Sequence, residues 1–212
     1  MTPSSATRPP AEALSDGDKA ALQSALRRLG LSEQSSIEAA FPLFHARRLA
    51  RGEYLLRAGE QATLVGVLVS GLLREHFVTD RGTERTKGFV TALKLTGSFA
   101  DVLSGRPSRA FIIAEQRARV VLAPYAEIRK LEAASPSWAA AVRRSIELLL
   151  LDKAEREYQF MCLDAEARYA AFVAEYPQLH ASLAASHIAS YLAITPVHLS
   201  RLRARRARAR RG

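Results

Sequence analysis

The sequence is poor in cysteine, with Cys162 as the single thiol among 212 residues. One thiol cannot form a disulfide within the chain, and it cannot supply a four-cysteine metal or iron–sulfur site. Cys162 falls in a stretch with helical periodicity, where we predict a buried and unreactive side chain.

Long hydrophobic runs are also missing. No apolar stretch approaches the roughly 20 residues that cross a bilayer as a helix, and the first residues lack the apolar region of a signal peptide. The apolar fraction of 48% is that of a globular protein, and 212 residues suffice for one large core or two small ones. We therefore expect a folded cytoplasmic protein with no membrane partner.

Acidic residues are absent from the C-terminal end of the sequence after Glu175. The same segment contains seven arginines, which contribute +7 of the formal net charge of +10 and leave +3 for residues 1–175. A basic end joined to a nearly balanced body is typical of proteins that bind polyanions. The C-terminal segment is therefore the first place to look for a nucleic-acid interface.

The segment 186–203 has the pattern of two short helices around a tight turn. The apolar residues of the first helix fall on one face, at Ile188, Ala189 and Leu192. Thr195 and Pro196 then form a helix start, because a hydroxyl cap is followed by a proline whose backbone suits the first turn.

In the second helix Leu199 and Leu202 face inward. The side chains that this leaves pointing outward are Val197, His198, Ser200 and Arg201. The arrangement predicts a helix-turn-helix whose second helix enters the major groove of DNA. An ordinary helical hairpin has the same apolar spacing, and it is the basic charge of the following residues that favours DNA.

Turn residues punctuate the sequence between Arg47 and Pro124 at short intervals. The runs between them predict strands at 54–56, 64–69, 72–78, 85–90, 110–114 and 118–122. Several short strands with regular turns favour a compact antiparallel barrel or jelly roll. Before this region we expect a disordered tail over residues 1–14 and short helices over 15–31 and 32–44.

The longest helical pattern begins at Ser135-Pro136 and continues to about Cys162. Over 146–151 it is apolar nearly all round, so it must be covered on two sides, by its own barrel and by a second copy of the chain. A helix in the core of a single domain is the alternative. The residues predicted to form the dimer interface are Val142, Ile146, Leu149, Leu150 and Phe160.

The order of barrel, long helix and helix-turn-helix resembles the Crp/Fnr family of bacterial transcription regulators, whose effector domain is a β-roll of the cyclic-nucleotide-binding type. In the barrel the resemblance rests on Gly52-Glu53, Gly59-Glu60, 66–71 and 80–82, and its most specific part is 188–203. It implies an α+β fold. The implied parts are an antiparallel β-roll with flanking helices over 15–134, a dimerisation helix over 135–162, and a helix-turn-helix domain with an arginine-rich tail over 163–212.

The resemblance also implies a homodimer that binds double-stranded DNA at a pseudo-palindromic operator. Arg201 falls at the family's recognition-helix arginine, which reads a guanine because a guanidinium fork fits O6 and N7 of that base. Pro196 and Val197 replace polar base-reading residues of better-known members, so the operator sequence is not implied. An activator would also contact RNA polymerase, and no residue identifies that patch. The predicted DNA-contacting residues are Thr195, Pro196, Val197, His198, Ser200, Arg201, Arg203, Arg205 and Arg206.

Family members that bind cyclic AMP have a phosphate-binding cassette that opens with Gly-Glu and continues to Arg-Ser-Ala or Arg-Thr-Ala. Here Ser98 stands in the place of the glutamate and Ser108 in that of the arginine, with Arg109 one position late. One step along a strand turns a side chain to the opposite face, and a buried phosphate without its arginine loses a charge-assisted contact. The residues of the candidate effector pocket are Gly97, Ser98, Phe99, Ala100, Ser108, Arg109 and Ala110.

These substitutions argue against cyclic AMP as the ligand, and we expect no cofactor. One alternative is a loop shift that recruits Arg109 and makes a cyclic-nucleotide-gated regulator. Others are a different anion or small acid bound near Arg106 and Arg109, and a pocket packed by its own side chains. A haem would need an axial ligand, for which the barrel region offers only His45 and His76.

Two other functions fit the sequence less well. An enzyme built on a cupin-like barrel would take a metal from clustered histidines and carboxylates, and His45 and His76 have no such spacing. No nucleophile elbow, P-loop or dinucleotide fingerprint is present. A non-specific nucleic-acid binder would depend on the arginine tail. We therefore predict a regulator rather than an enzyme, with no catalytic or metal-binding residues.

Overall fold

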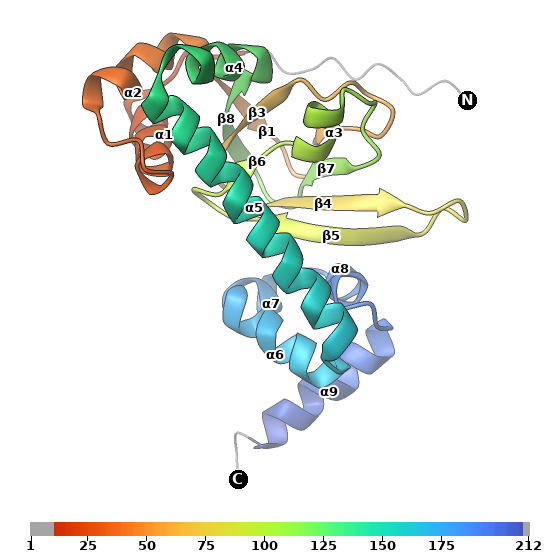
Figure 1. Ribbon diagram of the computed structural model, residues 1–212. Coiled ribbons are helices and arrows are strands. Elements are labelled where there is room, and N and C mark those ends of the chain that lie inside the picture. The colour runs from red at the N-terminus through yellow and green to blue at the C-terminus, as the bar shows by residue number, and fades with distance from the viewer. Residues whose placement is uncertain (1–10, 210–212) are drawn as a thin grey trace. The chain divides into compact units, whose positions relative to one another are not determined.

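The computed structural model describes residues 11–209, and the chain divides into two compact units (Figure 1). Unit 1 comprises the residues up to Glu75 together with Phe89–Ser145. Unit 2 comprises His76–Gly88 together with the residues from Ile146 onward. The boundaries therefore fall within a β-hairpin and within a long helix, and each unit is described by itself.

The boundaries of the predicted segments differ from those of the units. Helix α5 (Pro136–Cys162) contributes residues to both units, whereas the sequence predicts a separate helix over 135–162. Residues 1–10 of the predicted disordered tail lie outside the described residues, as do the last three residues of the arginine-rich end. Glu12 is ordered, since its backbone N–H and C=O each pair with Ala46 at 2.8 Å.

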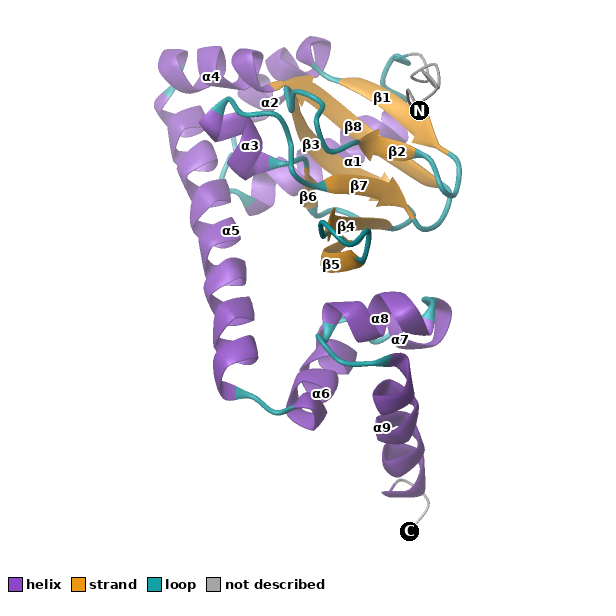
Figure 2. Ribbon diagram, turned by 90° about the vertical axis from the view of Figure 1, so that its right-hand side faces the viewer, coloured by secondary structure: helices purple, strands orange, loops and turns teal. Residues whose placement is uncertain are grey.

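The β-rich region forms two four-stranded sheets (Figure 2). The first sheet has the order β1 (His45–Leu49), β8 (Ala118–Pro124), β3 (Leu64–Ser70) and β6 (Leu95–Thr96). The second has the order β2 (Tyr54–Leu56), β7 (Phe111–Ala114), β4 (Leu73–Val78) and β5 (Glu84–Val90). The pairs β1–β8, β3–β8, β3–β6 and β2–β7 are antiparallel. The predicted antiparallel roll is confirmed, with β1 and β6 as strands that the sequence does not predict.

The two faces of β8 pack into different parts of the core. Successive side chains of a strand point to opposite faces, so Val120 and Leu122 lie on one face and Val121 and Ala123 on the other. The first pair belongs to an apolar cluster with residues of both sheets, which fills the roll. The second pair packs with helices on the outer face of the first sheet. All four side chains are fully buried.

The helices of unit 1 that cover this outer face are α1 (Asp16–Arg28), α2 (Gln34–Ala40), α4 (Tyr125–Ala134) and the beginning of α5. They contribute the buried side chains Leu22, Ile37 and Trp138 to the cluster. Val142 belongs to the same cluster and is 8% exposed. The sequence prediction places Val142 at a dimer interface, whereas the structure buries it within unit 1, because the first turns of α5 already have the roll as their packing partner.

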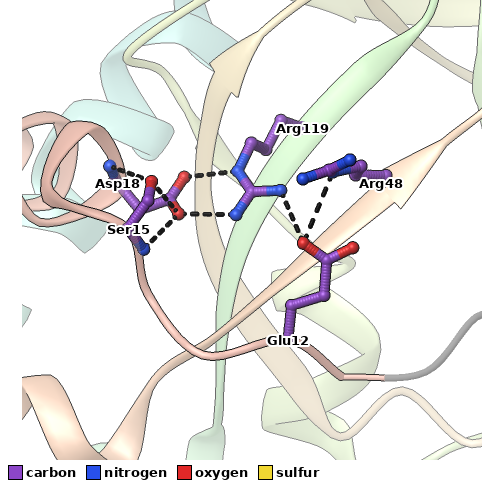
Figure 3. A network of polar contacts seen from close by, with 5 residues as sticks. All are labelled: Glu12, Ser15, Asp18, Arg48 and Arg119. Atoms are coloured by element: carbon purple, nitrogen blue, oxygen red, sulfur yellow. Dashed lines mark hydrogen bonds and ion pairs between the residues drawn. The ribbon is translucent and has the colours of Figure 1, made fainter.

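A network of charged side chains fixes α1 to β8 (Figure 3). The guanidinium of Arg119 donates to both carboxylate oxygens of Asp18, at 2.6 and 2.7 Å, and to Glu12 at 2.9 Å. The backbone N–H of Ser15, which caps α1, also donates to Asp18 at 2.8 Å. The hydrogen bonds from Arg119 above all lower the pKa of Asp18 to about 2, although its side chain is 1% exposed. The bidentate geometry makes this a strong contact.

The further helices in the described part of unit 2 are α6 (Ala165–Glu175), α7 (Leu179–Ser182), α8 (Ala185–Tyr191) and α9 (Pro196–Ala209). Its aromatic core is formed by Phe172, Tyr176 and Tyr191, with ring centroids 5.3 to 6.2 Å apart. Cys162 lies exposed at the end of α5, so the prediction of a buried thiol is wrong. Within the described part of the chain, no helix has both the length and the apolar character needed to span a membrane.

Candidate nucleic-acid interface and sensor cassette

Helices α8 and α9 are joined by a tight turn over residues 192–195. Ala193 has a φ of 54°, a left-handed conformation that is uncommon for residues other than glycine. Helix α9 begins at Pro196, and the hydroxyl oxygen of Thr195 accepts a hydrogen bond from the backbone N–H of His198 at 3.1 Å. Thr195 is therefore the N-cap of α9, as the sequence predicts.

One face of the helix pair is buried. The inward residues, each at most 3% exposed, are Ile188, Ala189, Leu192, Leu199 and Leu202. The predicted apolar spacing of both helices is confirmed, and the orientation of α9 about its own axis follows from it.

The opposite face of α9 is open to solvent. Val197 is 63% exposed, and Ser200 and Arg201 are exposed, while His198 is half-buried. Within residues 11–209, neither Ser200 nor Arg201 has a side-chain hydrogen bond or ion pair. Arg201, Arg205 and Arg208 form a stripe of exposed arginines along α9, because positions four and seven apart share one side of a helix.

The remaining predicted arginines of α9 make contacts within unit 2. Arg203 donates to the backbone carbonyl of His180 at 2.6 Å, and the guanidinium of Arg206 lies 6.0 Å from the ring centroid of Tyr169. Arg205 pairs with Glu166 at 3.6 Å, with both side chains largely exposed. Arg203 and Arg206 thus fasten α9 to its neighbours, which is a structural role that the sequence prediction does not include.

Two arginines outside the predicted site hold the end of α8. Arg156 of α5 donates to the backbone carbonyl of Tyr191, and Arg168 of α6 donates to that of Leu192 at 3.2 Å. The guanidinium of Arg156 also lies 3.5 Å from the ring centroid of Tyr191. These cations satisfy carbonyls at a helix C-terminus, where positive charge is favourable. The sequence carries no local signal for this contact, because the partners are more than twenty residues apart.

Helix α5 exposes a stripe of large apolar side chains beyond Ser145. Ile146 is 43% exposed, Leu150 64% and Phe160 40%, while Leu149 is half-buried. Leu151, Tyr158 and Met161 are exposed as well. An apolar stripe of this length is unusual on a surface that faces only water.

The cassette segment of unit 1 begins at Gly97, whose φ of 130° and close approach to the Leu64 carbonyl suit glycine alone. Helix α3 (Phe99–Ser104) follows it. The hydroxyls of Ser98 and Ser108 donate to the same carboxylate oxygen of Asp101, at 2.6 and 2.9 Å. Ser108, in the place of the family's arginine, is 3% exposed and faces the protein interior, whereas the Arg109 side chain is exposed.

The carboxylate of Asp101 is held in its ionised form. Burial raises its pKa, but the hydrogen bonds from Ser98, Ser108 and the backbone N–H of Arg109 outweigh this effect, so the pKa lies below its usual value. The charge of Arg109 is the smallest of these influences. No motif in the sequence singles out Asp101, although its spacing from two serines is visible there.

The interior of the roll contains a small cavity between Gly97, Ser98 and the strands. It has room for about one water molecule. Its lining is mostly aliphatic, with Leu55, Leu64 and Ile112 among the residues. Of the predicted pocket residues, only Gly97 and Ser98 line it.

The two histidines of the barrel region lie in different surroundings. His76 is buried, with Nε2 3.7 Å from a carboxylate oxygen of Glu84, and burial lowers the pKa of His45. Among residues 11–209, no three histidine, cysteine or acidic side chains are placed to hold a metal ion together.

Comparison with known proteins identifies the roll. Residues 46–135 match the family model of the cyclic nucleotide-binding domain. A search among curated proteins found no significant match.

Several solved structures share the fold over most of the chain. FixK2 from Bradyrhizobium japonicum is 19% identical, with a TM-score of 0.65 over 76% of this chain and 82% of that one. A CooA variant from Carboxydothermus hydrogenoformans is 20% identical, with a TM-score of 0.65 over 85% and 81%. A protein from Eubacterium rectale described as a Crp/Fnr-family transcriptional regulator is 15% identical, with a TM-score of 0.63 over 81% and 82%. Residues 46–135 therefore resemble a cyclic nucleotide-binding domain, and the chain shares its fold with solved Crp/Fnr-type regulators, as the sequence predicts.

Proposed function

We propose that the chain is a sequence-specific DNA-binding transcription regulator that acts as a homodimer and reads the major groove with α9. The observation that carries this proposal is the division of α9 into two faces. Leu199 and Leu202 fix one face in the core of unit 2, and Ser200 and Arg201 are left exposed on the other. Polar side chains held on a rigid helix are what direct base readout requires.

The charge of the same segment supports DNA as the partner. No acidic residue follows Glu175, while seven arginines do. Arg201 is the residue expected to contact a base, since its guanidinium is exposed and has no internal partner among the described residues. Arg205 and Arg208 lie farther along the same stripe and are expected to contact phosphates, which adds affinity without sequence preference.

The exposed apolar stripe of α5 supports a dimer, in which a second copy of the chain covers this stripe. Ile146 and Leu150 lie one helical turn apart, and Tyr158 and Met161 extend the stripe toward the end of the helix. Two such helices packed together would remove these side chains from water and give two recognition helices. A twofold dimer of this kind binds a pseudo-palindromic operator, with half-sites one helical turn apart.

Selection of binding sites from random duplex DNA tests the proposal, followed by affinity measurements on the selected and a scrambled site. Arg201→Ala is expected to cost about 1–3 kcal/mol on the selected site and to relax one base position in each half-site. Arg208→Ala is the matched control, because it removes the same side chain from the same stripe. It should weaken binding to both DNAs by the same factor. Equal weakening by Arg201→Ala would exclude base readout by this residue.

Sedimentation of the free protein tests the dimer. Leu150→Glu places a charge in the centre of the exposed stripe and should convert the dimer into a folded monomer. Lys153→Glu introduces the same side chain at a polar exposed position of α5 and should leave the dimer intact. A wild-type protein that sediments as a monomer at micromolar concentration would contradict this part of the proposal.

A second candidate function is non-specific nucleic-acid binding through the arginine tail. Deleting residues 204–212 distinguishes it from sequence-specific regulation. A sequence-specific regulator keeps its preference for the selected site at reduced affinity. A non-specific binder loses its affinity and shows no preference at any stage.

A further inference from the structure

Asp101 is a buried carboxylate in the cassette of unit 1, and the proposed function gives it no role. Its side chain accepts hydrogen bonds from the hydroxyls of Ser98 and Ser108, and the backbone N–H of Arg109 helps to lower its pKa. Ser108 is itself held in place, since its oxygen accepts the backbone N–H of Ala110 at 3.1 Å. Ser98 and Ser108 are 3% exposed and Asp101 is 8% exposed.

These donors form an anion site that the protein fills with its own anion. An ionised carboxylate only accepts hydrogen bonds, and hydroxyl and backbone N–H donors satisfy it in the way they satisfy a phosphate. The carboxylate remains ionised there, since the donors outweigh the effect of burial on its pKa. A second anion in this place would have to displace Asp101 or lie beside its buried charge, and either event is unfavourable.

The sequence resemblance indicates which contact is replaced. Ser108 stands where cyclic-AMP-binding members have the arginine that holds the phosphate, and its hydroxyl points to Asp101 instead. Arg109, the nearest cation in the sequence, has an exposed side chain. The site therefore contains an internal negative charge and lacks the buried positive charge that a phosphate would need.

The space inside the roll leads to the same conclusion. The cavity beside Ser98 has room for about one water molecule, which is far less than a nucleotide occupies. Its aliphatic lining, with Leu55, Leu56 and Ile112, offers no further charge to a nucleotide. The residues of this chain do not fit the ligand that the family of the domain implies.

We propose that the carboxylate of Asp101 is a built-in substitute for the ligand's phosphate, which closes the cassette to cyclic nucleotides and holds α3 against residues 108–110 without any ligand. Asp101 is thus a specificity-determining residue that excludes phosphate anions. The sensor domain consequently has its cassette fixed in one arrangement, and DNA binding by unit 2 does not depend on a cyclic nucleotide.

Calorimetric titration of the purified full-length protein with cyclic AMP and cyclic GMP tests the proposal, with thermal unfolding as a second readout. Three variants are compared with the wild type: Ser108→Arg, Asp101→Asn, and the double variant Ser108→Arg/Asp101→Asn. Asp80→Asn, at an exposed position of the hairpin turn, controls for the loss of one carboxylate. Thermal unfolding without ligand shows that each variant is folded before it is titrated.

We expect no saturable heat with the wild type, Asp80→Asn or Ser108→Arg. In Ser108→Arg the new guanidinium pairs with Asp101, so its charge is neutralised within the protein. The double variant supplies the cation and removes the internal anion, and it should bind a cyclic nucleotide at least about tenfold more tightly than Ser108→Arg. Its unfolding temperature should rise with ligand concentration, because a ligand that binds only the folded state stabilises it.

Two results would overturn the proposal. Saturable binding of a cyclic nucleotide by the wild type would show that Asp101 does not close the cassette. Equal affinity of Ser108→Arg and the double variant, including no binding by either, would show that the charge of Asp101 is not what excludes the ligand. Only one consequence of the closed cassette rests on the proposed function, namely that DNA binding does not depend on a cyclic nucleotide. The titration contains no DNA, so its failure is distinct from a failure of the operator-binding experiments.

Discussion

The cassette of unit 1 and the outer face of α9 in unit 2 differ in how their polar groups are satisfied. In the cassette, Ser98 and Ser108 donate to Asp101, and all three are buried. On α9, Ser200 and Arg201 are exposed and have no side-chain partner within the described residues. A group with an internal partner gains little from a ligand, whereas a solvated group exchanges water for a partner at small cost. This difference supports the proposal that binding takes place on α9 and not in the cassette.

The two faces of α9 should differ most in their effect on stability. Leu202→Ala removes a side chain that is 3% exposed and should lower the free energy of unfolding of unit 2 by about 2–5 kcal/mol. Val197→Ala, at a position 63% exposed, should change it by no more than about 0.5 kcal/mol. Denaturant unfolding followed by circular dichroism measures both. Similar losses for the two variants would mean that the assignment of buried and exposed faces is wrong.

A second buried carboxylate, Asp18, sharpens the comparison because an arginine rather than hydroxyls holds it. Its pKa of about 2 in the folded protein lies below the reference value of 3.8, so the ionised form stabilises the fold. This contribution is present above pH 4 or so and is lost as the pH falls toward 2, with a maximum of about 2 kcal/mol. Asp18→Asn should remove that part of the acid sensitivity.

The matched control for Asp18 is Asp16, which lies two residues earlier on the same helix. Asp16→Asn changes a fully exposed carboxylate and should leave the pH dependence of unfolding almost unchanged. Stability measured between pH 2 and pH 6 distinguishes the two variants. Parallel curves for Asp18→Asn and the wild type would contradict the role given to the contact with Arg119.

The start of α9 should show a smaller effect. Thr195→Ala removes the oxygen that accepts the backbone N–H of His198 and should cost about 1 kcal/mol of stability. Thr195→Ser keeps a capping hydroxyl and should cost much less. If the alanine and serine variants unfold at the same denaturant concentration, Thr195 does not act as a cap.

The smallest effect on stability is expected for Arg205. Its ion pair with Glu166 spans 3.6 Å between exposed side chains, and pairs of this kind contribute at most about 1 kcal/mol. Arg205→Ala should instead make the plot of log affinity against log salt concentration less steep, by about the slope that one phosphate contact contributes. An unchanged salt dependence would remove Arg205 from the DNA interface.

The sequence predicts those parts of the fold in which a local pattern decides the structure. The helix start at Thr195-Pro196 and the inward face of α9 depend on spacing within a few residues, and both are confirmed. The strands β1 and β6 are missed because β1 carries Arg47 and Arg48 and β6 is two residues long, so neither has an apolar alternation of its own.

Contacts between distant parts of the chain are the part that the sequence does not predict. Val142 and Ile146 lie one helical turn apart on α5. Only Val142 is buried, because unit 1 ends at Ser145 and Ile146 lies beyond it. Arg156 and Arg168 reach the end of α8 from other helices, and nothing near them in the sequence indicates it. In the cassette the register correctly places Ser108 inside, but the inward turn of Asp101 depends on the fold around it.

The decisive measurement is the affinity of the wild-type protein for its selected operator and for a scrambled duplex, with and without millimolar cyclic AMP. We expect a clear preference for the operator that cyclic AMP does not change. A preference that appears only when cyclic AMP is present would contradict the closed cassette. The absence of any preference would contradict base readout by α9.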